Sequence, residues 1–297
     1  MSLEGNWFTE EHQEAGSAFS FRLRQKLHEE QTPYQKIEIF ETENFGNLMA
    51  IDGFVMLTSW DNFLYHEMMT HPVLFTHAAP HRVLIIGGGD CGTLREVLKH
   101  PDITLAQQVD IDERVTRLSE QYFPELCESN NDPRAELHFA DGIKWVKEAD
   151  SNSYDVIIVD STDPIGPGEV LFTREFYQNC HRILAEDGLL VQQSESPLYH
   201  LELLTRMHQN MRSAGFARTQ TLNFPQPVYP SGWWSATMAG NTDLSAFRQR
   251  DVESKLFETR YYNHRIHSGA PVSYTHLTLP TRSCQCRSRW APDHETG

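Results

Sequence analysis

The chain has 297 residues and a formal net charge of −16 at pH 7, with 39% hydrophobic and 22% charged residues. These values describe an ordinary globular protein that is long enough for one large or two modest domains. The negative charge disfavours nucleic acid and anionic membranes as partners and weakly favours cationic ligands.

Targeting and redox features of the sequence are few. No apolar run approaches the roughly 18 residues that span a bilayer, and the first residues lack the pattern of a secretion signal, so we expect a cytoplasmic protein. The five cysteines show no paired framework, and the spacing of Cys284 and Cys286 is not that of a zinc site. We therefore expect reduced thiols.

Residues 17–59 have the pattern of β structure. Apolar residues alternate from Gln35 to Thr42, and Asp52-Gly53 lies between two apolar runs, which is a strong hairpin signal. So few residues make a marginal core alone. We predict a small N-terminal β domain over residues 1–60 that packs on a larger domain as a lid or a dimer contact.

The next segment, from Asp61 to Thr76, is predicted to be a helix that stops near Pro72. Its His66-Glu67 pair followed by His71 resembles the helix of a zinc protease. The second histidine comes five residues after the first instead of four, about 500° around a helix, which spoils convergence on one metal. We predict no metal site here.

A glycine turn follows the apolar strand from Val83 to Ile86 and precedes a predicted helix from Thr93 to His100. Its glycines fit a nucleotide-binding turn and are Gly87, Gly88, Gly89 and Gly92. About twenty residues on come Asp110 and Asp112, where an acid can accept hydrogen bonds from ribose hydroxyls.

Asp90 is the informative residue of this turn. A dinucleotide site places pyrophosphate at the helix N-terminus, and a carboxylate there would repel it. Asp90 therefore argues against NAD or FAD and favours a ligand that is cationic near the loop, such as a sulfonium or an amine. The alternative is that Asp90 only caps the helix.

Beyond the turn, predicted strands alternate with helical segments. This alternation predicts an α/β fold with a parallel sheet and helices on both faces, in which ligands bind beyond the carboxyl ends of the strands. The predicted strands cover Ile103 to Ile111, Glu136 to Ala140, Tyr154 to Asp160 and Gly188 to Gln193. Asp141, followed by Gly142, comes at such an end and could accept a hydrogen bond from an adenine amino group.

Two more acids follow the strand YDVIIVD. Asp160 and Asp163 lie three residues apart at its end, which is a costly arrangement unless a cation binds there. An ordinary capped turn is the alternative. Tyr229, in a proline-rich turn before a predicted strand from Trp233 to Ala239, could attract an ammonium through its ring, or could simply pack.

With these residues in place, the sequence from about Trp7 to His267 closely resembles the spermidine synthases, a family of polyamine aminopropyltransferases. The shared motifs include YQKIEIFET, LIIGGGD, DSTDPIGP, QSESP and YPSG. The resemblance implies an N-terminal β domain on a Rossmann-like, methyltransferase-type catalytic domain, here residues 61–267. It also implies a homodimer.

The resemblance also implies roles for individual residues. The donor, decarboxylated S-adenosylmethionine, would be a co-substrate, with no further cofactor. Its binding residues would be Gln35, Asp90, Asp110, Asp141, Gly142 and Pro167. The acceptor putrescine would lie against Tyr65, His66, Asp160, Asp163 and Tyr229, with Asp160 as general base.

The sequence departs from the family pattern at three places. Cys91 stands where glycine is usual, and Asp110 stands where glutamate is usual. After His267 the pattern disappears, and VSYTHLTLPT is typical of translated sequencing-adapter DNA. We interpret residues 268–297 as a frameshift or assembly artefact and exclude them from the predicted fold; a genuine disordered tail is the alternative.

The predicted function is therefore transfer of a propylamine group to putrescine, giving spermidine and methylthioadenosine. Other acceptors, such as cadaverine or agmatine, would keep the same chemistry. A methyltransferase that uses intact S-adenosylmethionine is disfavoured by Asp90, and a non-catalytic polyamine-binding protein would not need Asp160.

Overall fold

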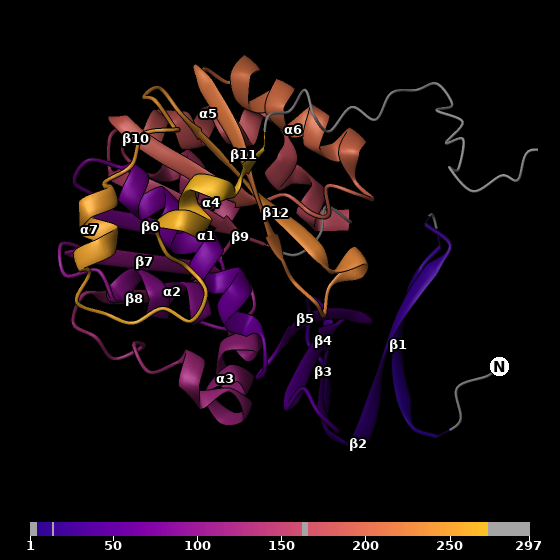
Figure 1. Ribbon diagram of the computed structural model, residues 1–297. Coiled ribbons are helices and arrows are strands. Elements are labelled where there is room, and N and C mark those ends of the chain that lie inside the picture. The colour runs from indigo at the N-terminus through magenta and orange to yellow at the C-terminus, as the bar shows by residue number, and fades with distance from the viewer. Residues whose placement is uncertain (1–4, 14, 162–165, 273–297) are drawn as a thin grey trace, which may run out of the picture.

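The computed structural model describes residues 5–13, 15–161 and 166–272, which form a small and a large β sheet (Figure 1). The small sheet is antiparallel and has the order β1-β2-β3-β4-β5. Its strands are Trp7–His12, Ser17–Gln31, Lys36–Thr42, Asn47–Ile51 and Phe54–Thr58. The β structure expected over residues 17–59 is confirmed, and β1 is an additional strand that the sequence pattern did not reveal.

The hairpin predicted at Asp52-Gly53 joins β4 to β5. Both residues have positive φ angles, 51° and 89°, as the tight turn that fits the twist of a hairpin requires. The Asp52 carboxylate also accepts a hydrogen bond from the backbone N–H of Lys36 at 2.8 Å, which ties the turn to β3.

The large sheet has the order β13-β11-β12-β10-β9-β6-β7-β8. Its strands are β6 (Arg82–Gly87), β7 (Leu105–Asp110), β8 (Ala135–Phe139), β9 (Tyr154–Asp160), β10 (Leu184–Gln193), β11 (Arg218–Pro225), β12 (Trp233–Gly240) and β13 (Pro271–Val272). β6 to β10 are parallel, as predicted. The sheet is nevertheless mixed, because β12 runs antiparallel to both β10 and β11.

The antiparallel pair has a simple cause. A parallel pair needs a crossover of a dozen or more residues, and the loop between β11 and β12 holds only the turn around η3 (Pro230–Gly232). That loop is too short for a helix. The chain therefore turns back, and the expectation of a wholly parallel sheet is corrected for the last strands.

Helices cover both faces of the large sheet (Figure 1). Alternate residues of β6 point to opposite sides: Val83 and Ile85 share a core with α1 and α2, whereas Leu84 and Ile86 share one with α4, α5 and α6. These helices are α1 (Asn62–Thr76), α2 (Gly92–Leu98), α4 (Gly142–Glu148), α5 (Arg174–Ile183) and α6 (Leu201–Ser213). The short helices η1 (Pro124–Leu126), η2 (Gly166–Phe172), α7 (Gln249–Ser254) and α8 (His264–Gly269) lie in the connections.

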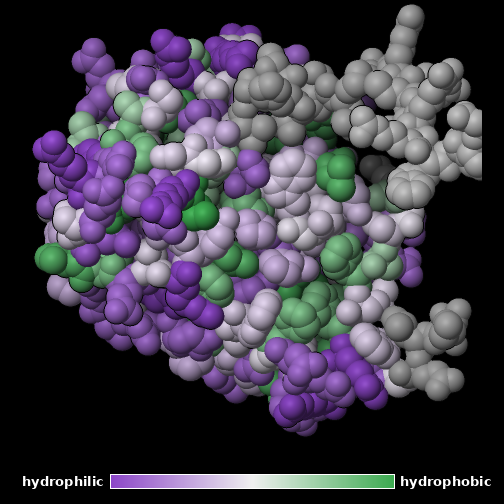
Figure 2. Space-filling model, in the orientation of Figure 1, coloured by the Kyte–Doolittle hydropathy of each residue, from purple (hydrophilic) through white to green (hydrophobic). Residues whose placement is uncertain are grey.

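The two sheets meet through α3 (Glu113–Tyr122). Val115 and Leu118 of this helix share a buried cluster with Ile37 and Ile39 of β3. Figure 2 shows hydrophobic residues gathered on the visible face where the small sheet meets the larger body. The small sheet thus packs on the larger domain, as its limited core requires.

Helix α1 does not stop near Pro72, as predicted from the sequence, but continues to Thr76. A proline inside a helix removes one hydrogen bond and costs about 3 kcal/mol. Val73 and Leu74, just beyond it, are completely buried in the core of the large sheet. Burial of such side chains contributes about 1.5–3 kcal/mol each, which is enough to outweigh the proline.

The predicted tail is described only in part. Ser268 and Gly269 end α8, and Pro271–Val272 forms β13, which pairs with β11. The rest of residues 268–297 lies outside the described residues, so the interpretation of this stretch stays a prediction. Within the described part of the chain, every helix is too short or too polar to cross a bilayer.

Candidate active site

The site forms where β6 and β9 end side by side. Gly87 and Gly88 have φ angles of +83° and +66°, and Gly88 N donates to the Asp160 carbonyl at 2.7 Å. A Cβ atom on Gly87 would lie 2.1 Å from that same carbonyl oxygen. Glycine is therefore required there, because only glycine combines a positive φ with so close an approach.

Asp160 lies at the centre of the site. Its Oδ1 accepts a hydrogen bond from Tyr65 Oη at 2.7 Å, and its Oδ2 accepts one from Thr93 Oγ1 at 2.6 Å. Burial and the nearby charge of Asp90 raise the pKa of Asp160, although His66 and the two hydroxyl groups act in the opposite direction. The structure thus brings together Asp160 and Tyr65, which the sequence analysis had placed in one site.

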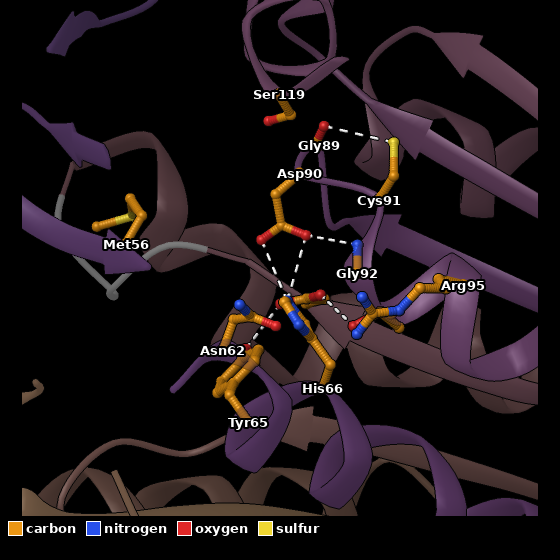
Figure 3. Close-up of polar contacts among 12 residues, drawn as sticks. Met56, Asn62, Tyr65, His66, Gly89, Asp90, Cys91, Gly92, Arg95 and Ser119 are labelled. Carbon is orange, nitrogen blue, oxygen red and sulfur yellow. Dashed lines mark hydrogen bonds and ion pairs between the residues drawn. The ribbon is translucent and has the colours of Figure 1, made fainter. Parts of the chain in front are cut away.

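Asp90 has two roles in this arrangement (Figure 3). It precedes the N-cap residue Cys91, and its Oδ1 accepts a hydrogen bond at 2.6 Å from the N–H of Gly92, the first residue of α2. It also lies 3.2 Å from His66 Nε2. Asp90 therefore does more than cap the helix, which was the alternative interpretation of this residue.

Asp90 and His66 form an ion pair. Burial opposes charge on both, but the His66 ring lowers the pKa of Asp90, and Asp90 raises the pKa of His66. The ring lies so close to α2 that a Cβ atom on Gly92 would be 2.2 Å from His66 Cε1. Gly92 is thus needed for close approach and not for an unusual φ angle.

The two histidines of α1 point to different neighbours. His66 contacts Asp90 through its Nε2. His71 instead lies in the core, where its Nε2 is 3.1 Å from Glu96 Oε2 and its Nδ1 is 3.0 Å from His100 Nε2. No group of three or more His, Cys, Asp or Glu side chains suited to a metal ion occurs among the described residues.

A second part of the site lies at the end of β7. Asp110 Oδ1 accepts a hydrogen bond from Asp112 N at 2.8 Å, and a Cβ atom on Gly89 would lie 2.9 Å from Asp110 Oδ2. Burial raises the pKa of Asp110 to about 6. Gln35 Nε2 donates to Asp112 Oδ2 at 3.1 Å, so a side chain from the small sheet reaches this strand end.

Asp141 lies at the end of the neighbouring strand β8. It is the N-cap of α4 and accepts hydrogen bonds from Ile143 N at 2.8 Å and Lys144 N at 3.3 Å. Its exposed carboxylate keeps lone pairs for a ligand. A Cβ atom on Gly142 would lie 2.7 Å from Ile86 Cγ2, so this glycine lets α4 begin close against β6.

Tyr229 borders a small pocket beside Asp160. Its ring packs 5.9 Å from Tyr65 and 4.7 Å from Trp234, and its hydroxyl group donates to the Met56 carbonyl. It therefore packs and lines the pocket at the same time. The pocket is lined by Glu10, Phe54, Val55, Met56, Tyr65, Ser161, Gln193, Tyr229, Pro230 and Trp234.

Two residues of the site were not predicted from the sequence, and the side chains of two predicted residues lie outside the described part of the structure. Glu10 lies on β1, is 4% exposed and accepts a hydrogen bond from Val55 N at 2.7 Å; its strand was not predicted, so no pattern marked it. Thr93 was seen only as the start of a helix. Asp163 lies outside the described residues, and Pro167 is described only as part of η2.

Comparisons with known protein families match both parts of the chain. Residues 62–249 match a domain described as the spermine/spermidine synthase domain. Residues 6–59 match one described as the spermidine synthase tetramerisation domain. The boundary between the two matches coincides with the junction between β5 and α1.

Individual proteins are similar over nearly the whole chain. A polyamine aminopropyltransferase of Methylococcus capsulatus is 66% identical over 265 residues, which cover 89% of this chain and 93% of that protein. One of Nitrosococcus oceani is 65% identical over 261 residues, covering 88% and 92%.

Solved structures show the same fold. A spermidine synthase in complex with the transition state analogue AdoDATO is 35% identical, with a TM-score of 0.87 and 94% of each chain covered. The spermidine synthase of Thermotoga maritima is 34% identical, with a TM-score of 0.87 and coverage of 93% of this chain and 94% of that one.

Proposed function

This chain belongs to the spermine/spermidine synthase family, and we propose that it transfers the aminopropyl group of decarboxylated S-adenosylmethionine to putrescine. The chain is an enzyme, a polyamine aminopropyltransferase like its relatives. The finer proposal concerns the acceptor, the products spermidine and methylthioadenosine, and the roles of the site residues.

The pair of carboxylates Asp90 and Asp160 is the observation that carries the proposal. Asp160 ends β9 and Asp90 lies in the turn after the neighbouring parallel strand β6, close enough for its charge to act on Asp160, and burial opposes the charge of each. Two anionic groups held so close to each other favour cationic ligands. A sulfonium donor with a free ammonium and a diamine acceptor together supply such charges.

The nucleoside part of the donor would occupy the neighbouring strand ends. Asp110 and Gln35 would receive the ribose, and Asp141 with Gly142 and Pro167 would border the adenine. Asp90 would face the propylammonium group. It would also repel the carboxylate of intact S-adenosylmethionine, which the decarboxylated donor lacks.

The reaction would be a nucleophilic displacement. The amine nitrogen of putrescine forms a bond to the propyl carbon next to sulfur, and the C–S bond breaks with its electron pair on sulfur, which becomes a neutral thioether. The leaving group therefore needs no proton. An alkylammonium with a pKa of about 10.4 is only about one part in a few thousand free base at pH 7, so activating the amine is the harder task.

Asp160 would carry out this activation. It would bind the acceptor ammonium and take one of its protons, for which a raised pKa is an advantage. His66, Tyr65 and Tyr229 would hold the acceptor so that its lone pair points at the carbon opposite sulfur; Asp163 belongs to the same proposal. Placement of the reactants would supply much of the rate.

The pocket beside Asp160 supports a short diamine as acceptor. Tyr65 and Trp234 give it aromatic walls, and Ser161 places it next to Asp160. Glu10, also in its wall, is already paired with His12, whose Nε2 lies 2.7 Å from Glu10 Oε1, and its Oε2 accepts a hydrogen bond from Val55 N. An amine with a short apolar chain would place its ammonium group at Asp160 and its chain against these aromatic walls.

The acceptor can be tested directly. The purified chain is incubated with decarboxylated S-adenosylmethionine and, separately, putrescine, cadaverine, agmatine or spermidine, and methylthioadenosine and each polyamine product are measured. We expect spermidine from putrescine to form fastest. A higher kcat/KM for another amine would keep the reaction and overturn the acceptor.

The role of Asp160 gives the first prediction. Asp160→Asn keeps the shape of the side chain but removes the base, so turnover should fall by about two to four orders of magnitude. Methylthioadenosine binding, measured by calorimetry, should persist. Asp187→Asn is the matched control, because Asp187 lies near the start of the neighbouring parallel strand β10, away from the strand ends that form the site, and its side chain is 60% exposed. Near-normal turnover by the Asp160→Asn variant would refute the assignment of Asp160 as the general base.

Assembly and location belong to the same proposal. The small sheet matches a tetramerisation domain by description, so we propose a homo-oligomer that is larger than the homodimer expected from the sequence. A cytoplasmic location stays a prediction.

A further inference from the structure

Thr93 holds the Asp160 carboxylate from a second helix. It is the second residue of α2, has no exposed surface, and donates through Oγ1 to Asp160 Oδ2 at 2.6 Å. Tyr65, from α1, donates to the other oxygen at 2.7 Å. The two carboxylate oxygens are therefore each fixed by a hydroxyl group from a different helix.

The alternative acceptor for the Thr93 hydroxyl is already occupied. A threonine in a helix commonly donates to the carbonyl one turn earlier, which here is Gly89 O. That carbonyl accepts a hydrogen bond from Thr116 Oγ1 at 2.8 Å and contacts Cys91 Sγ at 3.6 Å. Because a β-branched side chain has few rotamers, the hydroxyl is directed to Asp160.

The charges around Asp160 make this hydrogen bond important. Asp90, in the glycine turn, repels the ionised carboxylate, and burial also disfavours it. His66 and Tyr65, both on α1, favour it. Thr93 adds a neutral donor on the side of α2. A hydroxyl group that donates to a carboxylate stabilises the charged form and fixes its plane.

We propose that Thr93 is a positioning residue for aminopropyl transfer: its hydroxyl group fixes the Asp160 carboxylate and keeps it in the anionic form that can accept the amine proton. This inference rests on the proposed role of Asp160 as base. Thr93 does not need to touch either substrate for this purpose.

Thr93→Val tests the proposal, because valine has nearly the same shape and lacks the donor. We expect the acid limb of the kcat/KM profile to move upward by about one pH unit, the size expected for one hydrogen bond to an ionised group. On that limb kcat/KM should fall about tenfold, while KM for putrescine changes little well above it. Thr93→Ser should restore the wild-type profile.

A second readout does not depend on activity. The Asp160 carboxyl carbon is titrated by ¹³C NMR in the wild type and in Thr93→Val, with its resonance assigned through Asp160→Asn. Its midpoint should move upward with the kinetic limb. Thr221→Val is the matched control, because Thr221 is also a buried threonine with a bonded hydroxyl group but lies on β11 and contacts His208.

The outcomes separate the two proposals. An active Asp160→Asn variant would overturn the base and, with it, the role of Thr93. If Asp160→Asn were inactive but Thr93→Val left both the pH profile and the NMR midpoint unshifted, Asp160 would remain the base. Only the positioning role of Thr93 would then be overturned. A uniform loss of kcat at every pH, with no shift of either midpoint, would show a merely structural residue and would also overturn the proposal.

Discussion

Asp90 and Asp160 are close enough for their charges to interact, yet their neighbours push their pKa values in opposite directions. The His66 ring lowers the pKa of Asp90, whereas burial and the charge of Asp90 raise the pKa of Asp160. Environments that separate two carboxylates in this way point to different roles for them. Asp90 suits a fixed negative charge, and Asp160 suits the group that takes up and releases a proton.

Asp110 gives a prediction on pH dependence. Its pKa is raised to about 6, so it is protonated below that pH and ionised above it. An ionised carboxylate accepts hydrogen bonds from ribose hydroxyl groups, and a protonated one accepts them less well. Affinity for methylthioadenosine should therefore rise as the pH increases from 5 to 7 and then level off.

Calorimetric titrations at several pH values between 5 and 8 measure this affinity. Binding near pH 6 should also release protons, because the ligand favours the ionised form of Asp110. Asp110→Asn should flatten the pH dependence. An affinity that is constant across this range in the wild type would contradict the assignment of Asp110 to the ribose.

At the scale of elements, the turn between β2 and β3 is held by the turn between β7 and α3. Asp112 is 2% exposed, and its Oδ2 accepts hydrogen bonds from Thr32 Oγ1 at 2.7 Å and Gln35 Nε2 at 3.1 Å. Its Oδ1 caps α3 through Arg114 N at 3.1 Å. One carboxylate thus links the small sheet to the end of β7 and the start of α3.

Asp112→Asn separates these two functions. Asparagine is a good N-cap, so α3 should keep its cap, but the new amide donates where Thr32 and Gln35 need an acceptor. We expect the free energy of unfolding in urea to fall by about 1–3 kcal/mol. Methylthioadenosine should also bind several times more weakly, because Gln35 loses its anchor.

The control for this variant is Asp251→Asn, which changes an acid with a 51% exposed side chain paired to Arg248. An exposed pair contributes about 0–1 kcal/mol, so stability and nucleotide affinity should stay close to those of the wild type. If Asp112→Asn behaved like this control, the link between the sheets would have no energetic importance.

Individual elements show what the sequence could predict. Asp90, Asp110 and Asp160 were found because they follow apolar strands in an alternating pattern, and the parallel sheet brings such ends together. His66 and Tyr65 came only from the resemblance, since α1 is buried along nearly all of its length and shows no distinct face. Thr93 and Glu10 were missed, because a threonine in a first helical turn and a glutamate in a short N-terminal segment carry no pattern of their own.

At the scale of the whole molecule, charge and assembly are connected. Each chain carries a formal charge of −16, which keeps anionic partners away but also makes copies of the chain repel one another. The small sheet matches a domain described as a tetramerisation domain, and within the described residues its edge strands are β1 and β5. An oligomer must therefore form against electrostatic repulsion. Salt weakens this repulsion, because at 0.1 M the Debye length is about 10 Å and charges farther apart than that are largely screened.

We expect sedimentation velocity at 0.15 M salt to give a species of four times the 34.3 kDa chain mass. At about 0.01 M salt the Debye length is roughly 30 Å, so the repulsion is screened less. The same sample should then dissociate at higher protein concentrations than at 0.15 M. A sample that stayed at twice the chain mass under both conditions would support the homodimer expected from the sequence instead. If dissociation increased with added salt, attraction between opposite charges would hold the copies together. Burial of apolar surface in opposition to charge repulsion would then not be the main force.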